Sequence, residues 1–256
     1  MLLRRPWTRV LGYWLATYRR TWVASAFTDF LAPVLFLAGL GLGLGRAVGG
    51  GAGVDGVPYA AFLAPGLLAG QAMQAAIFAA TFPVFGAIKW NKAYHAMLAT
   101  PLTPGDVVAG HLAFVVARLV TTSAAFALVA SALGALTGVG AVLAAGVAVA
   151  TGVPFAAFAF ALSARVESDQ AFPLVFRFVM LPLFLFSGTF FPLEQLPAPL
   201  VLVAWATPLA HGVAVCRHLA LGTAGPVDLV HLAVVAGFAV AGVALALRQL
   251  RTRMVV

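Results

Sequence analysis

The fold of this chain is decided by the stretch Phe186-Ser187-Gly188-Thr189-Phe190-Phe191-Pro192-Leu193-Glu194-Gln195-Leu196-Pro197. It starts as the end of an apolar helix, which the Ser-Gly pair loosens. The prolines then break it, because proline lacks a backbone donor and blocks a helix interior. Apolar residues resume over 200–215. Irregular backbone is not tolerated against lipid and survives only where protein or a water-filled cavity satisfies its polar groups. The stretch therefore indicates a translocation path or its gate.

The composition predicts an all-α polytopic membrane protein. Hydrophobic residues make up 63% of the chain and charged residues 9%, against about 25% charged residues in a soluble domain. The formal net charge of +8 does not indicate nucleic-acid binding, because the basic residues lie between apolar spans. The single cysteine, Cys216, excludes an intrachain disulfide and a cysteine-based metal cluster.

Six stretches are long and apolar enough to cross a bilayer, which takes about 20 residues. They form one transmembrane domain over 22–256, with spans at 22–45, 59–86, 107–135, 141–163, 171–189 and 229–247. Residues 1–21 place apolar and basic side chains on opposite faces of a helix, which predicts a helix lying in the membrane interface. A cleaved signal peptide is the alternative, but the apolar run that follows is longer than the roughly 7–15 residues of a signal-peptide core. Gly41–Gly45 and Gly66–Gly70 have a spacing that lets helices approach closely.

The basic residues predict the orientation. Eleven of the 15 Lys and Arg fall on one side of a six-span topology. Since cytoplasmic loops carry the excess of Lys and Arg, both termini are expected in the cytoplasm. A seventh span would move the arginines of the tail to the outside. Residues 200–215 are therefore expected to be re-entrant or interfacial rather than a seventh span.

The chain lacks the motifs of an ATPase or a hydrolase. It has no Gly-Lys-Ser/Thr phosphate loop, no His-Glu-x-x-His motif and no Gly-x-Ser-x-Gly elbow. Its acidic residues lie near predicted span ends, so a proton relay through mid-membrane carboxylates is not supported. His211 and His218 are seven residues apart and could share a helical face, but they are read as interfacial histidines without a metal because no carboxylate partner is evident. We expect no enzyme activity and no metal or cofactor on this chain, and energy supplied by another subunit.

Arg118 and Arg177 lie within predicted spans. Arg118 is deep in the third span, where a charge normally faces the bundle interior or a wet cavity. It is a candidate for the substrate path, with a structural ion pair or carbonyl contact as the alternative. Arg177 lies close enough to the end of the fifth span to snorkel to the cytoplasmic interface.

The longest polar interruption is 87–106, and the segment 89–104 lies within it. Residues 91–99 predict a short amphipathic helix, which Thr100-Pro101 ends because the residue before proline avoids the helical region. Thr103 is expected to cap the start of the third span. A short helix joined to two spans could transmit force, and a solvated connector is the alternative.

Several segments, taken in order, resemble the ABC-2 type permease family, in its nodulation-protein-J and daunorubicin-resistance branch. The matching stretches span most of the chain and lie at residues 29–33 with 39–43, 59–66, 94–102, 187–197, 207–211 and 221–222. Many relatives carry an acidic residue in the cytoplasmic segment where this chain has His95, which leaves open the charged contact made there.

The resemblance implies a two-part machine. Two permease subunits, a homodimer or a pair with a paralogue, form the membrane core, and two separate ATPase subunits hold ATP and Mg. The residues expected to couple to the ATPase are Trp90, Asn91, Tyr94, His95, Met97, Leu98, Thr100 and Pro101. The outer gate would contain Ser187, Gly188, Phe190, Phe191, Pro192, Glu194 and Pro197. Residues 190–216 would form a re-entrant helical hairpin on the outer side, between the fifth and sixth spans.

The function expected on these grounds is export across the cytoplasmic (inner) membrane of a bacterium. The multi-pass permease would move an amphipathic substrate such as a drug, a lipid or a lipo-oligosaccharide. The alternative is a membrane assembly or anchoring subunit that transports nothing. A membrane enzyme has less support, because no catalytic constellation is present.

Overall fold

The computed structural model describes residues 5–39 and 56–254, with residues 21–34 and 36 described by their backbone alone. All the elements of regular secondary structure in these two ranges are helices, so the all-α prediction is confirmed for the described residues. In chain order they are α1 Trp7–Phe36, α3 Tyr59–Ala80, α4 Phe82–Lys89, α5 Ala93–Leu98, α6 Pro104–Ala132, α7 Gly138–Arg165, α8 Ala171–Val175, η2 Phe176–Met180, α9 Leu181–Phe186, η3 Leu193–Gln195, α10 Ala198–Trp205, α11 Pro208–Leu221 and α12 Val227–Met254.

Four helical stretches among the described residues are long and apolar enough to cross a membrane. The first combines α3 and α4, and the other three are α6, α7 and α12. A fifth is added if α10 and α11, which meet at an angle of 86°, count as one broken span. The run Ala171–Phe186 is apolar but shorter, and the predicted span 22–45 extends beyond the described residues. The chain is thus a multi-pass membrane protein, while the total of six spans stays a prediction.

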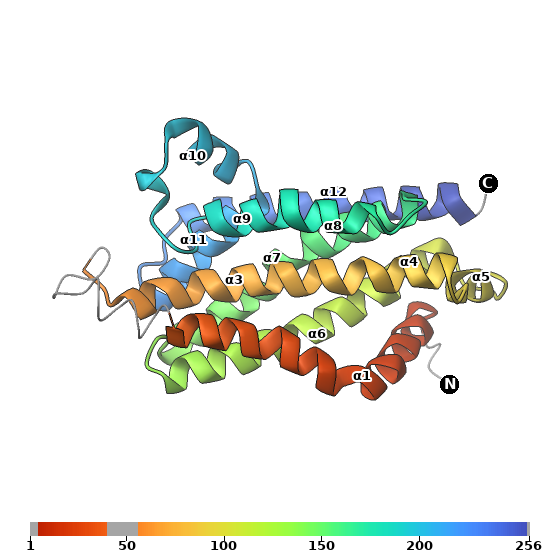
Figure 1. Cartoon of the computed structure of the whole chain (residues 1–256), viewed down its shortest axis with the longest axis horizontal. Coiled ribbons are helices and arrows are strands. Elements are labelled where there is room, and N and C mark those ends of the chain that lie inside the picture. The colour runs from red at the N-terminus through yellow and green to blue at the C-terminus, as the bar shows by residue number, and fades with distance from the viewer. Residues whose placement is uncertain (1–4, 40–55, 255–256) are drawn as a thin grey trace.

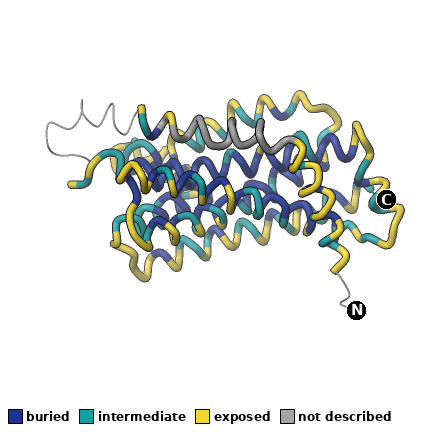
Figure 2. Tube along the Cα trace, turned by 90° about the horizontal axis from the view of Figure 1, so that it is seen from below, coloured by how far each residue is buried: buried dark blue, intermediate teal, exposed yellow. Residues whose placement is uncertain are grey.

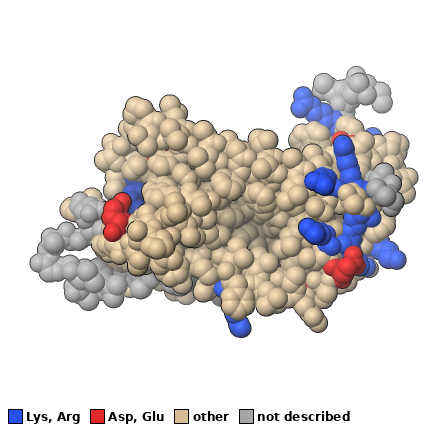
Figure 3. All heavy atoms as spheres, turned by 90° about the horizontal axis from the view of Figure 1, so that it is seen from above, with Lys and Arg blue, Asp and Glu red and all other residues tan. Residues whose placement is uncertain are grey.

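The long helices run side by side, and the two ends of the bundle differ (Figure 1). The start of α1, the end of α12 and α5 lie at one end, whereas α10 and α11 lie toward the other. Lys and Arg side chains gather at the end that holds α5 (Figure 3). The bundle therefore has a basic end and an end that carries the broken helices.

Helix α7 lies at the centre of the core, in contact with α3, α6, α11 and α12. Buried residues follow the inner faces of the bundle, and exposed ones its rim and ends (Figure 2). Glycines let the helices approach closely: a Cβ on Gly152 would lie 3.1 Å from the Ala72 carbonyl oxygen, and one on Gly242 2.9 Å from the Ala157 Cβ. Such contacts leave little freedom for sliding within this group of helices.

The N-terminal segment is part of a longer helix. α1 continues from Trp7 to Phe36 without interruption, although Figure 1 shows a bend along it. Val10 and Trp14, on the predicted apolar face, are buried, and α1 packs against α6. The boundary predicted at residue 21 therefore does not coincide with a helix end, and an interfacial position for residues 1–21 stays a prediction.

Candidate functional site

The break after the fifth predicted span is present in the structure. α9 ends at Phe186, the chain is irregular from Ser187 to Pro192, and the short η3 then leads to α10. Gly188 has φ +81°, a left-handed conformation that favours glycine because a Cβ would be strained there. The expected helix break at Ser187–Gly188 is therefore confirmed.

Helix α3 holds the broken segment in place. The Tyr59 hydroxyl donates to the Phe190 carbonyl at 3.2 Å, and the Thr189 hydroxyl donates to the Gly66 carbonyl at 3.5 Å. Gly66 is a contact point, because a Cβ there would lie 2.8 Å from the Thr189 Cα. Gly70 meets the Phe184 ring in the same way. The close approach predicted from the Gly66–Gly70 spacing is confirmed, whereas Gly41 and Gly45 lie outside the described residues.

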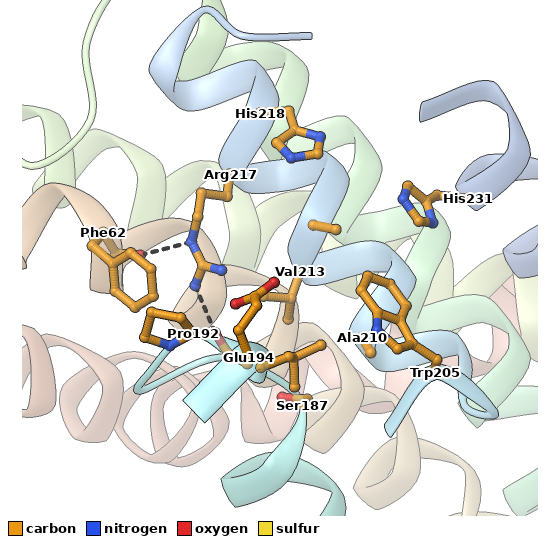
Figure 4. Close-up of a pocket in the computed structure, with 13 residues that line it drawn as sticks. Phe62, Ser187, Pro192, Glu194, Trp205, Ala210, Val213, Arg217, His218 and His231 are labelled. Atoms are coloured by element: carbon orange, nitrogen blue, oxygen red, sulfur yellow. Dashed lines mark hydrogen bonds between the residues drawn. The ribbon is translucent and has the colours of Figure 1, made fainter. Parts of the chain in front are cut away.

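Arg217 joins the break to α3. From α11, its Nη2 donates to the Gly188 carbonyl at 2.6 Å and its Nε to the Phe62 carbonyl at 3.3 Å (Figure 4). Its Cζ lies 3.8 Å from the centroid of the Phe62 ring. The guanidinium thus gives an acceptor-rich, irregular backbone the donors it needs in an apolar setting. Sequence reasoning gave Arg217 no role, since only the fold brings residues 62, 188 and 217 together.

A cavity of about 330 Å³ lies beside this arginine. Four of the seven predicted gate residues line it, Ser187, Gly188, Pro192 and Glu194, together with residues of α10, α11 and α12. Figure 4 shows the Glu194 carboxylate directed toward the Arg217 guanidinium.

The other three gate residues do not line the cavity. Phe190 packs edge-on against Phe184 with ring centroids 5.1 Å apart, Phe191 is half-buried, and Pro197 is exposed before α10.

His218 of α11 and His231 of α12 line the cavity, and His211 lies next to His231. His211 Nε2 lies 2.9 Å from the Trp205 carbonyl, and its Nδ1 lies 2.7 Å from His231 Nδ1. Because the carbonyl can only accept, His211 donates from Nε2. His218 pairs with Asp228 at 2.6 Å.

No group of three or more His, Cys, Asp or Glu suited to a metal ion occurs within residues 5–39 and 56–254. The carboxylate partner of His218 was overlooked in the sequence because Asp228 reaches it only through the turn between α11 and α12.

At the basic end of the bundle, α5 is anchored by a buried side chain. Tyr94 is fully buried, and its hydroxyl donates to His111 Nδ1 at 2.9 Å. His111 Nε2 in turn donates to the Ala79 carbonyl at 3.0 Å. Burial raises the pKa of Tyr94 well above its ordinary value of 10.0, so the hydroxyl keeps its proton. One chain of hydrogen bonds therefore ties α5 to α6 and α3.

Most of the remaining predicted coupling residues face outward. Trp90 is 61% exposed. Asn91, His95, Thr100 and Pro101 are also exposed, and Met97 and Leu98 are half-buried. The predicted cap at Thr103 is confirmed as a capping box, since Thr103 Oγ1 accepts from the Asp106 backbone and Asp106 accepts from the Thr103 backbone. The structure thus presents a short, stiff, exposed helix between α4 and α6.

An ion-pair network closes the same end. Glu167, after α7, pairs with Lys89 of α4 and with Arg253 of α12, whose Nη2 lies 3.0 Å from Glu167 Oε1. Arg253 Nη1 also donates to the carbonyls of Ala164, Arg165 and Val166, at the end of α7. The hydrogen bond from Lys89, followed by the charge of Arg253, lowers the pKa of Glu167 below its ordinary value.

Arg118 lies away from the cavity. It is a half-buried residue of α6, and its Cζ lies 5.6 Å from the centroid of the Tyr18 ring on α1. The structure does not place it with the gate residues, and its role in a substrate path stays a prediction.

The chain matches known proteins over most of its length. Residues 9–221 match the ABC-2 type transporter family. The nodulation protein J of Rhizobium leguminosarum bv. viciae is 34% identical over 216 residues, which cover 82% of each chain. That of Rhizobium meliloti (strain 1021) is 32% identical over 226 residues, covering 86% of this chain and 84% of the relative. That of Sinorhizobium fredii (strain NBRC 101917 / NGR234) is 31% identical over 261 residues, covering 99% and 97%. This chain belongs to the ABC-2 type transporter family and is a membrane component of an ABC transporter.

Proposed function

We propose that this chain is the permease subunit of an ATP-driven exporter in the cytoplasmic membrane of a bacterium. Two permeases, identical or paralogous, would work with two copies of an ATPase subunit that binds ATP and Mg. The observation that carries the proposal is the arrangement of two features on one set of helices. An anchored, exposed helix lies at the basic end, and a broken helix with a cavity lies toward the other.

Helix α3 connects these features. Near one end, its Ala79 carbonyl accepts from His111, the residue that holds Tyr94 of α5. Near the other end, Gly66 and Phe62 contact the broken segment and Arg217. A displacement of α5 by an ATPase would therefore reach the break through one helix and its packed neighbours.

The gathering of Lys and Arg at the α5 end supports a cytoplasmic position for that end (Figure 3). The broken segment 190–216 would then lie on the outer side as a re-entrant hairpin. The similar proteins bear the name nodulation protein J. We infer that the substrate is amphipathic, such as a drug, a lipid or a lipo-oligosaccharide.

The proposal is tested by purifying the chain with the ATPase encoded beside it. We expect a stable complex whose ATPase rate differs from that of the isolated ATPase. The double variant Met97→Asp with Pro101→Ala should abolish this difference and transport while the complex still forms, because Met97 of α5 is half-buried and Pro101, which follows the helix, is exposed. Gln170→Asp, which adds the same charge to a neighbouring exposed loop, serves as the control.

The alternative, a subunit that anchors or assembles the complex, predicts a different result. The complex would form, but the ATPase rate would not respond to the permease and vesicles would show no transport. Failure of the chain to bind any ATPase would overturn both functions.

A further inference from the structure

Arg217 is placed to hold the break against α3. It donates hydrogen bonds to carbonyls of two different elements, Phe62 in α3 and Gly188 in the irregular segment. The Phe62 ring covers one face of the guanidinium. Hydrogen bonds from a charged donor are about twice as strong as neutral ones, so this residue is a principal link between the two elements.

Opening a path beside the break would separate these two carbonyls. The broken segment rests on α3 through Thr189 and Gly66, with Tyr59 bonded to Phe190. Once it moves away, the guanidinium cannot keep both carbonyls within hydrogen-bonding distance. The guanidinium then loses one carbonyl acceptor, and in an apolar setting a charged donor favours a replacement.

Glu194 provides that acceptor. It lies on η3, directly after the break, and lines the same cavity as Arg217. Its carboxylate points toward the guanidinium (Figure 4). Because η3 is joined to the break, Glu194 travels with the moving segment, and its long side chain keeps the guanidinium within reach.

We propose that Arg217 is the latch of the outer gate, and that Glu194 takes over from the Gly188 carbonyl as its acceptor when the gate opens. Arg217 is in this sense a positioning residue, which sets the balance between a closed and an open break. The inference rests on the export function proposed above. It predicts opposite effects for the two residues: loss of Arg217 favours the open gate, and loss of Glu194 favours the closed gate.

The test measures how fast a thiol at the gate reacts. Thr189→Cys places a small reporter where the break touches α3, at a side chain that is fully buried. The native Cys216, which is also buried, is changed to Ala. The full chain is reconstituted in lipid nanodiscs with its ATPase, and labelling by a water-soluble maleimide is timed without and with ATP.

Without ATP, we expect Arg217→Gln to raise the labelling rate about tenfold, given the loss of two charge-assisted hydrogen bonds, and Glu194→Gln to lower it. Arg217→Lys should give an intermediate rate, because an ammonium cannot span both carbonyls or stack flat on Phe62. Gel filtration shows whether each variant folds. If Arg217→Gln does not fold, the labelling rate of Arg217→Lys decides the test. Gln195→Ala, an exposed change on the same turn, should label like the parent.

Three outcomes decide between the claims. Equal rates in all variants, or faster labelling in both Arg217→Gln and Glu194→Gln, would overturn the latch. The predicted order of rates would support it. Failure of ATP to alter labelling of the parent, with the order of variants retained, would remove the export function and leave the latch.

Discussion

At the scale of single residues, Tyr94 shows how one buried side chain fixes a polar connecting segment to the spans. The surrounding segment is polar enough to be a solvated connector, yet Tyr94 is buried among Trp14, His111 and Phe160. It therefore fixes α5 to the spans, while the neighbouring residues remain free to face a partner. We infer that its contribution to coupling is to position the helix.

Tyr94→Phe should weaken this anchor. The change keeps the ring but leaves the buried Nδ1 of His111 without its donor, which costs about 1–3 kcal/mol. We expect a lower thermal unfolding midpoint in detergent and a smaller effect of the permease on the ATPase rate. His95→Ala, at an exposed position of the same helix, should leave the midpoint unchanged. Equal midpoints for Tyr94→Phe and the parent would show that α5 is held by other contacts.

The sequence identified residue roles where they depend on neighbours along the chain. The Thr103–Asp106 cap and the break at Ser187–Gly188 are local patterns, so both could be predicted. Arg217, the Asp228 partner of His218 and the Tyr94–His111 bond each depend on elements that are distant in the chain or separated by a turn. No periodicity or spacing reports such contacts, and for that reason they were missed.

At the scale of elements, helix contacts in this bundle are set by small residues. A Cβ on Gly212 of α11 would run into the side chain of Thr151 on α7. The Ala-rich and Gly-rich composition was visible in the sequence, but the glycines that face a neighbour could not be distinguished from those that face outward. The extent of α1 was missed for a related reason, since charge pattern alone does not show where a helix ends.

Gly212→Ala should destabilise the chain by about 1–3 kcal/mol, because overpacking forces α11 away from α7. Gly146→Ala is the matched control, since nothing lies within 4 Å of a Cβ at that helical position. There the change should be neutral or slightly stabilising, as alanine favours helix more than glycine does. Thermal unfolding in detergent compares the two. A loss of stability as large for Gly146→Ala as for Gly212→Ala would contradict the assignment of Gly212 as a contact point.

At the scale of the whole molecule, the Lys89–Glu167–Arg253 network joins three elements that are far apart in the chain. The all-helical, multi-pass architecture followed from composition and span length. The contact between residues 89, 167 and 253 could not be predicted from composition or span length, because it depends on how α4, α7 and α12 are arranged around one another.

This network gives the chain an acid-sensitive element of stability. The pKa of Glu167 is lowered in the folded chain from its ordinary value of 4.5. Its contribution is therefore fully present above about pH 4.5 and is lost as the pH falls through the lowered value. We expect the unfolding midpoint to fall on acidification in this range, and to fall less in Glu167→Gln.

Asp169→Asn, which removes a carboxylate of the same loop, is the control and should behave like the parent. Because the Glu167 carboxylate is exposed, added salt should also reduce the difference between the parent and Glu167→Gln. An identical acid response in Glu167→Gln and the parent would exclude this network as the cause.

The glycine contacts of α7 have a consequence for how motion passes through the protein. Gly152, Gly212 and Gly242 bring α3, α11 and α12 so close to α7 that we expect the four helices to move as one rigid unit. A closely packed unit of this kind cannot absorb a small displacement of α5 by sliding of its helices. Arg217 and Phe62 belong to this group of four helices, whereas Gly188 belongs to the broken segment outside it. A displacement at the basic end would therefore reach the contacts between these helices and the broken segment with little loss.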